Sequence, residues 1–126
     1  MSGYFDGPGP EAVFRAHLGE GRFMIQRSAS TGAYVFYPRL VAPGTGEADL
    51  AWVEASGEGT VYATTVARRR PSTGGDYNVA LIDLAEGPRM MSRVVGIAPE
   101  AVTIGMRVRA KVDELNGAPA VLFEPV

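Results

Sequence analysis

Short runs of alternating apolar and polar residues make up the chain from residue 57 onward. Between Met106 and Leu115, for example, Val108, Ala110 and Val112 occupy alternate positions, and Arg or Lys stands between them. This alternation is typical of a strand with one buried and one exposed face. Five strands and one helical turn are predicted in this region: Gly59–Arg69, Tyr77–Leu84, Arg89–Val95, the helical turn Pro99–Ala101, Met106–Leu115, and a strand that includes Val121–Phe123.

The order of these elements indicates a particular barrel. Asn116-Gly117 is the strongest hairpin signal, because both residues tolerate positive φ and so join the last two strands tightly. Three strands, a short helical connector and a two-stranded hairpin are the order of an OB-fold. We therefore predict a five-stranded OB-fold barrel over residues 51–126 and assign the chain to the mainly β class.

The first fifty residues are predicted to form a helix and a small ribbon of strands. Pro10 and Glu11 favour a helix start, and Gly19 and Gly21 favour its end. Strands and turns then follow in the order Phe23–Arg27, turn Ser28–Gly32, Ala33–Tyr37, turn Ala42–Ala48 and Leu50–Ala55. We therefore divide the chain into an N-terminal arm and helix (1–22), a ribbon-like subdomain (23–50) and the barrel (51–126).

Composition narrows the possible functions. The formal net charge is −2, whereas nucleic-acid binders usually have a basic excess. The chain has no Cys, which excludes disulfides and thiolate metal sites. We find neither a signal peptide at the start nor an apolar run long enough to span a membrane, and we expect a cytoplasmic protein with no membrane partner.

Several motifs resemble a family of bacterial and archaeal proteins that join a helical segment, a rubredoxin-like zinc ribbon and an OB-fold. The matching stretches are FRAHLGEGRFMIQR (14–27), YPR (37–39), WVEASGEGTVY (52–62), YNVALIDLAEGPR (77–89) and VGIAPEAVTIGMRV (95–108). Members are often encoded beside thiolases, ketoacyl synthases or enoyl-CoA hydratases. The resemblance implies a protein that binds or channels acyl-CoA together with such an enzyme.

One departure from the family concerns its metal site. Members commonly carry two Cys-x-x-Cys turns, and here these positions hold Ser28, Thr31, Ala42 and Thr45. Hydroxyl groups are poor Zn²⁺ ligands, and Ala is not a ligand at all. We therefore expect no metal in this chain, and a ribbon that holds its shape by packing.

Arg68, Arg69 and Arg70 form the sharpest cluster of charge, at the end of the first barrel strand. Forked guanidinium groups suit the phosphates of coenzyme A, and Arg39 is a further candidate for that role. A nucleic-acid backbone or an acidic partner surface would suit them as well. The alternative without function is a solvated loop end that keeps the sheet edge soluble.

A second candidate site is aromatic. Phe23, Phe36, Tyr37 and Trp52 are expected to line a slot between the two subdomains, where a pantetheine or acyl chain, or a partner enzyme, would lie, and Tyr77 is a further candidate for this surface. Trp52, Tyr62, Tyr77 and Phe36 would alternatively form a stacking surface for bases. In the strands of small barrels, however, aromatic residues more often belong to the core.

No set of residues in the sequence supports catalysis. His17 is the only histidine, and the chain has neither a Gly-x-Ser-x-Gly elbow nor a P-loop. We therefore expect a non-catalytic accessory protein that binds acyl-CoA, a thiolase-like or enoyl-CoA-hydratase-like enzyme, or both; a homodimer is also compatible with the sequence. The alternatives are a single-stranded nucleic-acid binder and a small enzyme of acyl-CoA metabolism.

Overall fold

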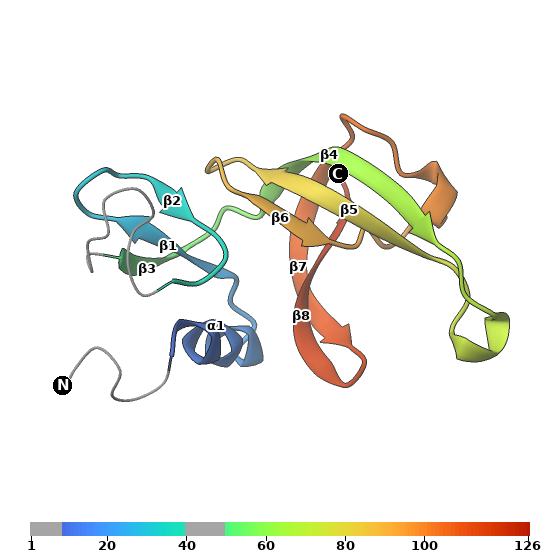
Figure 1. Ribbon diagram of the computed structural model, residues 1–126, viewed down its shortest axis with the longest axis horizontal. Helices are drawn as coiled ribbons and strands as arrows, with labels where there is room; N and C mark the ends of the chain where they lie inside the picture. The colour runs from blue at the N-terminus through green and yellow to red at the C-terminus, as the bar shows by residue number, and fades with distance from the viewer. Residues whose placement is uncertain (1–8, 40–49) are drawn as a thin grey trace.

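A computed structural model describes residues 9–39 and 50–126 (Figure 1). Ala42 and Thr45, two of the four former ligand positions, lie outside the described residues. Within these residues, one helix, two single 3-10 turns and eight strands follow in chain order: α1 (Pro10–Gly19), β1 (Met24–Ser28), β2 (Tyr34–Val35), β3 (Leu50–Glu54), β4 (Glu58–Ala67), η1 (Pro71–Thr73), β5 (Tyr77–Leu84), β6 (Arg89–Ser92), η2 (Pro99–Ala101), β7 (Arg107–Leu115) and β8 (Ala118–Pro125).

The C-terminal part is the predicted OB-fold barrel. Its five antiparallel strands are ordered β6-β5-β4-β7-β8, and η2 lies between the third strand and the final hairpin. Val94 pairs in parallel with Phe123 of β8, which brings the chain after β6 against the last strand. Asn116 and Gly117 have φ of 52° and 83°, and Leu115 pairs directly with Ala118, so the predicted two-residue hairpin is confirmed.

Alternation along β5 decides which side chains enter the barrel. Asn78, Ala80, Ile82 and Leu84 are all buried, and the residues between them are half-buried on the outer face. The third barrel strand was expected to continue to Val95, but β6 ends at Ser92. The chain leaves β5 at that point because the next residues pair with β8 instead: Phe123 N–H donates to Arg93 O, and Val95 N–H donates to Phe123 O.

The N-terminal strands form a separate three-stranded sheet of order β2-β1-β3. β3 pairs with β1 along its whole length, so residues 50–54 belong to this sheet. β2 is shorter than the expected strand Ala33–Tyr37 and pairs only with Gln26 and Arg27. After Val35 the chain turns toward α1, where the rings of Phe36 and Phe14 meet edge to face at 5.4 Å.

One hydrophobic core holds the two sheets together. Leu18 of α1, Phe23 and Ile25 belong to the same buried cluster as Ile82 and Phe123 of the barrel. Helix α1 lies between the small sheet and the β7–β8 hairpin, which extends beyond the body of the barrel toward it (Figure 1). The small sheet therefore gains its stability by packing on the barrel. Within residues 9–39 and 50–126, no helix is long and apolar enough to cross a membrane.

Candidate functional site: an apolar groove and an arginine cluster

An apolar groove of about 690 Å³ separates α1 from the tip of the β7–β8 hairpin. Its floor includes residues from the exit of β2 and from β6. The lining residues are Glu11, Phe14, Arg15, Leu18, Phe36, Tyr37, Pro38, Met90, Met91, Leu115, Ala118, Pro119, Ala120 and Val121. Arg15 and Glu11 are paired at 2.7 Å, so the charges at this edge neutralise each other and the groove is left apolar.

The aromatic residues of the expected slot come together, but they do not share one role. Phe36 and Tyr37 line the groove, with ring centroids 4.7 Å apart. Phe23 contacts Phe36 edge to face and is buried in the core, whereas Trp52 reaches the cluster through Phe14. Phe14 is the residue that sequence reasoning missed. Its place on the helix gave no sign that it would join strand residues.

Two side chains leave apolar or aromatic surface exposed at the groove. Tyr37 is 54% exposed and Met91 is 59% exposed, the latter on the outer face of β6. The backbone N–H of Met91 donates to the Tyr37 hydroxyl at 3.3 Å, which ties the two residues together. Methionine adapts its shape to irregular partners. The groove thus offers an adaptable apolar rim beside one anchored phenol.

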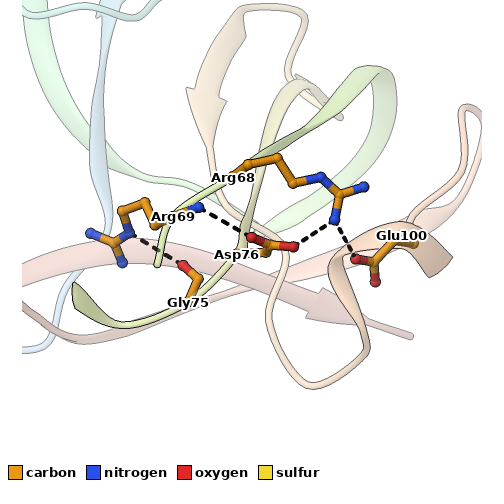
Figure 2. A network of polar contacts seen from close by, with 5 residues as sticks. All are labelled: Arg68, Arg69, Gly75, Asp76 and Glu100. Atoms are coloured by element: carbon orange, nitrogen blue, oxygen red, sulfur yellow. Dashed lines mark hydrogen bonds and ion pairs between the residues drawn. The ribbon is translucent and has the colours of Figure 1, made fainter. Parts of the chain in front are cut away.

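The three consecutive arginines do not act as one cluster. The Arg68 guanidinium is paired with Asp76 and Glu100, and Asp76 also accepts the backbone N–H of Arg69 (Figure 2). Hydrogen bonds from Arg68 and from the Arg69 backbone lower the pKa of Asp76 below its ordinary value, so this carboxylate stays ionised at neutral pH. The positive charge of Arg68 is therefore already paired with the carboxylates of Asp76 and Glu100.

Arg69 turns to the opposite side of the loop from Arg68 (Figure 2). Its guanidinium lies 4.5 Å from the centre of the Tyr77 ring, and the guanidinium of Arg93 lies 4.1 Å from the same ring. Arg39 does not join Arg69 and Arg93 at the Tyr77 ring. Its backbone pairs with Gln26 in the small sheet instead.

Tyr62, Tyr77 and Trp52 are not core residues, whereas Phe123 of β8 is fully buried in the barrel. Tyr62 is 49% exposed, and the Arg89 guanidinium lies 3.3 Å from its ring centre while Nε of Arg89 donates to Asp83. Tyr77 and Trp52 are only partly buried. These rings lie on the outside because Val, Ile and Phe side chains already fill the small barrel.

Side-chain hydrogen bonds stabilise the turn that holds Ser28 and Thr31, the positions expected from the resemblance to have lost their ligands. Ser28 is 1% exposed, and its hydroxyl lies 3.1 Å from that of Ser30 and 3.4 Å from the backbone nitrogen of Thr31. Gly32 N–H donates to Ser28 O, which closes the turn. A buried serine hydroxyl thus contacts the turn from inside.

Gln26 holds the chain beyond β2 from the same side. Its Nε2 donates to Arg39 O at 2.8 Å, and its Oε1 accepts from Arg39 N–H at 2.7 Å, as in a pair of strand residues. Gln26 is 4% exposed, so this amide pair lies away from water. A side chain of β1 therefore positions the segment after Tyr37, and Pro38 of this segment lines the groove.

We expect Gln26→Ala to lower the free energy of unfolding by about 2 kcal/mol, because two part-buried hydrogen bonds to the backbone of Arg39 are lost. Urea denaturation followed by circular dichroism measures this loss. Arg39→Ala is the matched control, because it removes the side chain but keeps the backbone pair, and it should change stability by less than about 0.5 kcal/mol. Equal losses in both variants would contradict the role assigned to Gln26.

Neither a metal centre nor a catalytic group emerges from the geometry of the described part of the chain. No three His, Cys, Asp or Glu side chains within residues 9–39 and 50–126 are placed to hold a metal ion. The imidazole of His17 packs against Trp52 at 5.7 Å between ring centres, and its buried Nδ1 has no hydrogen-bond partner among those residues. His17 thus serves as part of the aromatic cluster.

Comparisons with known proteins agree with this architecture. A family model described as the C-terminal OB-fold domain of ChsH2 matches residues 52–113. The chain is 30% identical over 113 residues to a DUF35 domain-containing scaffold protein of Pyrococcus furiosus, with 85% of this chain and 83% of that protein covered. It is 40% identical over 89 residues to a probable enoyl-CoA hydratase alpha subunit of Thermomonospora curvata, but spans only 28% of that subunit.

A solved structure is similar along nearly the whole chain. It is described as an Ltp2-ChsH2(DUF35) aldolase, and one of its chains superposes with a TM-score of 0.82 at 32% identity, with 95% of this chain and 97% of that chain covered. The fold is thus that of an OB-fold protein with an N-terminal helix and small sheet. The chain belongs to the DUF35 family.

Proposed function

We propose that this chain is a non-catalytic accessory subunit that binds a thiolase-like or hydratase-like enzyme of acyl-CoA metabolism. The observation that carries the proposal is the similarity, over almost its full length, to a DUF35 chain of an Ltp2-ChsH2 aldolase structure. The name of its Pyrococcus furiosus relative, a scaffold protein, supports the same role. The hydratase alpha subunits that it matches belong to the same area of metabolism.

The groove is the surface that suits such a partner. Exposed apolar surface with aromatic residues and Met at its centre is typical of protein interfaces, in which such residues contribute much of the binding energy. Tyr37 and Met91 have this character, and the pairing of Arg15 with Glu11 removes local charge. A stable complex buries at least about 1,000 Å², so the partner would also cover α1 and the hairpin tip around the groove.

The groove also suits part of the ligand. Its volume and apolar lining fit a pantetheine arm or an acyl chain, provided that the partner enzyme covers its open side. In that arrangement the accessory chain would form one wall of a shared binding site. The partner would supply the chemistry, because the imidazole of His17 packs against Trp52 and its Nδ1 has no hydrogen-bond partner among the described residues.

The test is co-expression with any thiolase-like or hydratase-like enzyme encoded beside this gene, followed by size-exclusion chromatography and an activity assay. Met91→Asp should weaken the complex about tenfold or more, because it places a charge in an apolar contact. Ile104→Asp is the matched control, since Ile104 is 71% exposed and does not line the groove. Separate elution, with the enzymes fully active alone, would rule out the accessory role.

A further inference from the structure

Two arginine side chains from different parts of the barrel share one aromatic ring. Tyr77 begins β5, Arg69 follows β4, and Arg93 follows β6. Their guanidinium groups lie 4.5 Å and 4.1 Å from the ring centre. The negative face of the ring attracts each cation, but the two cations repel one another. An anion beside both guanidinium groups would relieve that repulsion.

Arg69 is held in place before any ligand arrives. Its Nε donates to Gly75 O, and its backbone N–H donates to Asp76. A Cβ on Gly74 would stand only 2.8 Å from Nη2 of Arg69. This glycine, with φ of 109°, therefore leaves the space that the guanidinium occupies. Because Nε is already engaged with the loop, the Nη groups are the donors left for a ligand.

Arg93 is held through its backbone. Its carbonyl accepts from Phe123 N–H, and the N–H of the next residue, Val94, donates to the buried amide of Asn78. The Cα of Arg93 is thus fixed between β5 and β8, and its side chain reaches the Tyr77 ring from a rigid base. Pre-positioned donors bind anions with less loss of side-chain entropy.

The nearby acids are engaged elsewhere. Asp76 and Glu100 both pair with Arg68, on the other side of the loop (Figure 2). Within residues 9–39 and 50–126, neither Arg69 nor Arg93 takes part in an ion pair. Arg68 therefore pairs with the carboxylates that would otherwise compete for these two cations.

We propose that Arg69 and Arg93, held around Tyr77, bind a phosphate group. A carboxylate has one charge and two oxygens, which a single guanidinium satisfies, whereas a phosphate has enough charge and oxygens for two forks. The site adjoins the loop between the first two barrel strands, which OB-folds present to ligands. An acyl-CoA, the ligand class of the proposed function, is one source of such a phosphate, and a nucleic-acid backbone is another.

Calorimetric titration of the full chain with pyrophosphate, ADP and a single-stranded oligothymidylate of about twelve residues separates these sources. Each probe is tested at about 50 mM and about 200 mM salt, because phosphate contacts weaken as salt rises. Tighter binding of the oligonucleotide than of ADP identifies a nucleic-acid backbone as the source. Binding of ADP and pyrophosphate without this preference identifies a small phosphate ester.

The double variant Arg69→Gln/Arg93→Gln should weaken binding of the phosphate probes about tenfold or more, since two charge-assisted contacts are lost. The control variant Arg22→Gln/Arg109→Gln, an equal change of charge at exposed positions before β1 and in β7, should leave binding unchanged. An unchanged melting temperature shows that the double variant folds. The proposal is overturned if the parent protein binds none of the probes at low salt, or if the double variant binds them as the parent does.

This outcome is separable from that of the accessory role. The double variant should still co-elute with the partner enzyme, because the groove lies on other residues. The Met91→Asp variant should still bind phosphate. Met91 lines the groove and bonds to Tyr37, whereas the Tyr77 ring contacts Arg69 and Arg93. Loss of one activity with retention of the other therefore identifies which of the two proposals fails.

Discussion

Replacing Asn78 by Ala should destabilise the fold by about 3–4 kcal/mol, a large fraction of the stability of a small domain. Asn78 is 1% exposed and makes three hydrogen bonds inside the barrel. Its Nδ2 donates to the Thr64 hydroxyl and to Thr65 O, and its Oδ1 accepts from Val94 N–H. Alanine would remove the hydrogen bonds that Asn78 makes to two backbone groups. These are Thr65 O in β4 and Val94 N–H after β6.

Thermal and urea denaturation measure this effect, and Thr64→Val is its control. The valine removes one partner but leaves Asn78 bonded to Thr65 and Val94, so we expect a loss of about 1 kcal/mol. The Asn78→Ala variant should also bind phosphate less well, because Val94 follows Arg93 directly. A loss below about 1 kcal/mol in Asn78→Ala would mean that water replaces the amide without cost.

Gly59→Ala should cost about 2–3 kcal/mol through overpacking. A Cβ at this buried position of β4 would stand 2.6 Å from Cγ2 of Ile82 and 3.1 Å from Asp83 O. Ile82 is fully buried and branched at Cβ, so neither it nor the backbone of β5 can yield easily. The same variant should therefore unfold at a clearly lower urea concentration than the parent.

Two comparisons make this expectation specific. Gly19→Ala, at the end of α1 where nothing lies within 4 Å, should stabilise the protein by about 0.5–1 kcal/mol. In the Gly59→Ala background, Ile82→Ala should cost less than it does alone, because it removes the atom that the new methyl group meets. Additive losses would show that Gly59 is required for a reason other than the space beside Ile82.

The barrel could be predicted because its information is local. Alternation in β5 and β7, the Asn116-Gly117 turn and the η2 turn at Pro99–Ala101 each follow from neighbouring residues. The limits of β2 and β6 could not be predicted in the same way. Their ends depend on Phe36 meeting Phe14 and on residue 94 meeting β8, and those partners are distant in sequence.

The same distinction between local and long-range information applies to the candidate sites. The sequence pointed to Arg68–Arg70 and to the aromatic residues because charge runs and ring content are visible in composition. It did not show that Arg68 pairs with Glu100, or that Arg93 joins Arg69 on Tyr77. The groove likewise needed Phe14 and the hairpin tip, which lie about a hundred residues apart along the chain.

By itself, then, the sequence determined the class of fold, the succession of the barrel strands along the chain, and the residue types available for binding. Only the tertiary structure decided which of those residues act together. The physical reason is that periodicity and turn propensity act between near neighbours, whereas pairing of charges and packing of rings depend on distances that the folded chain alone establishes.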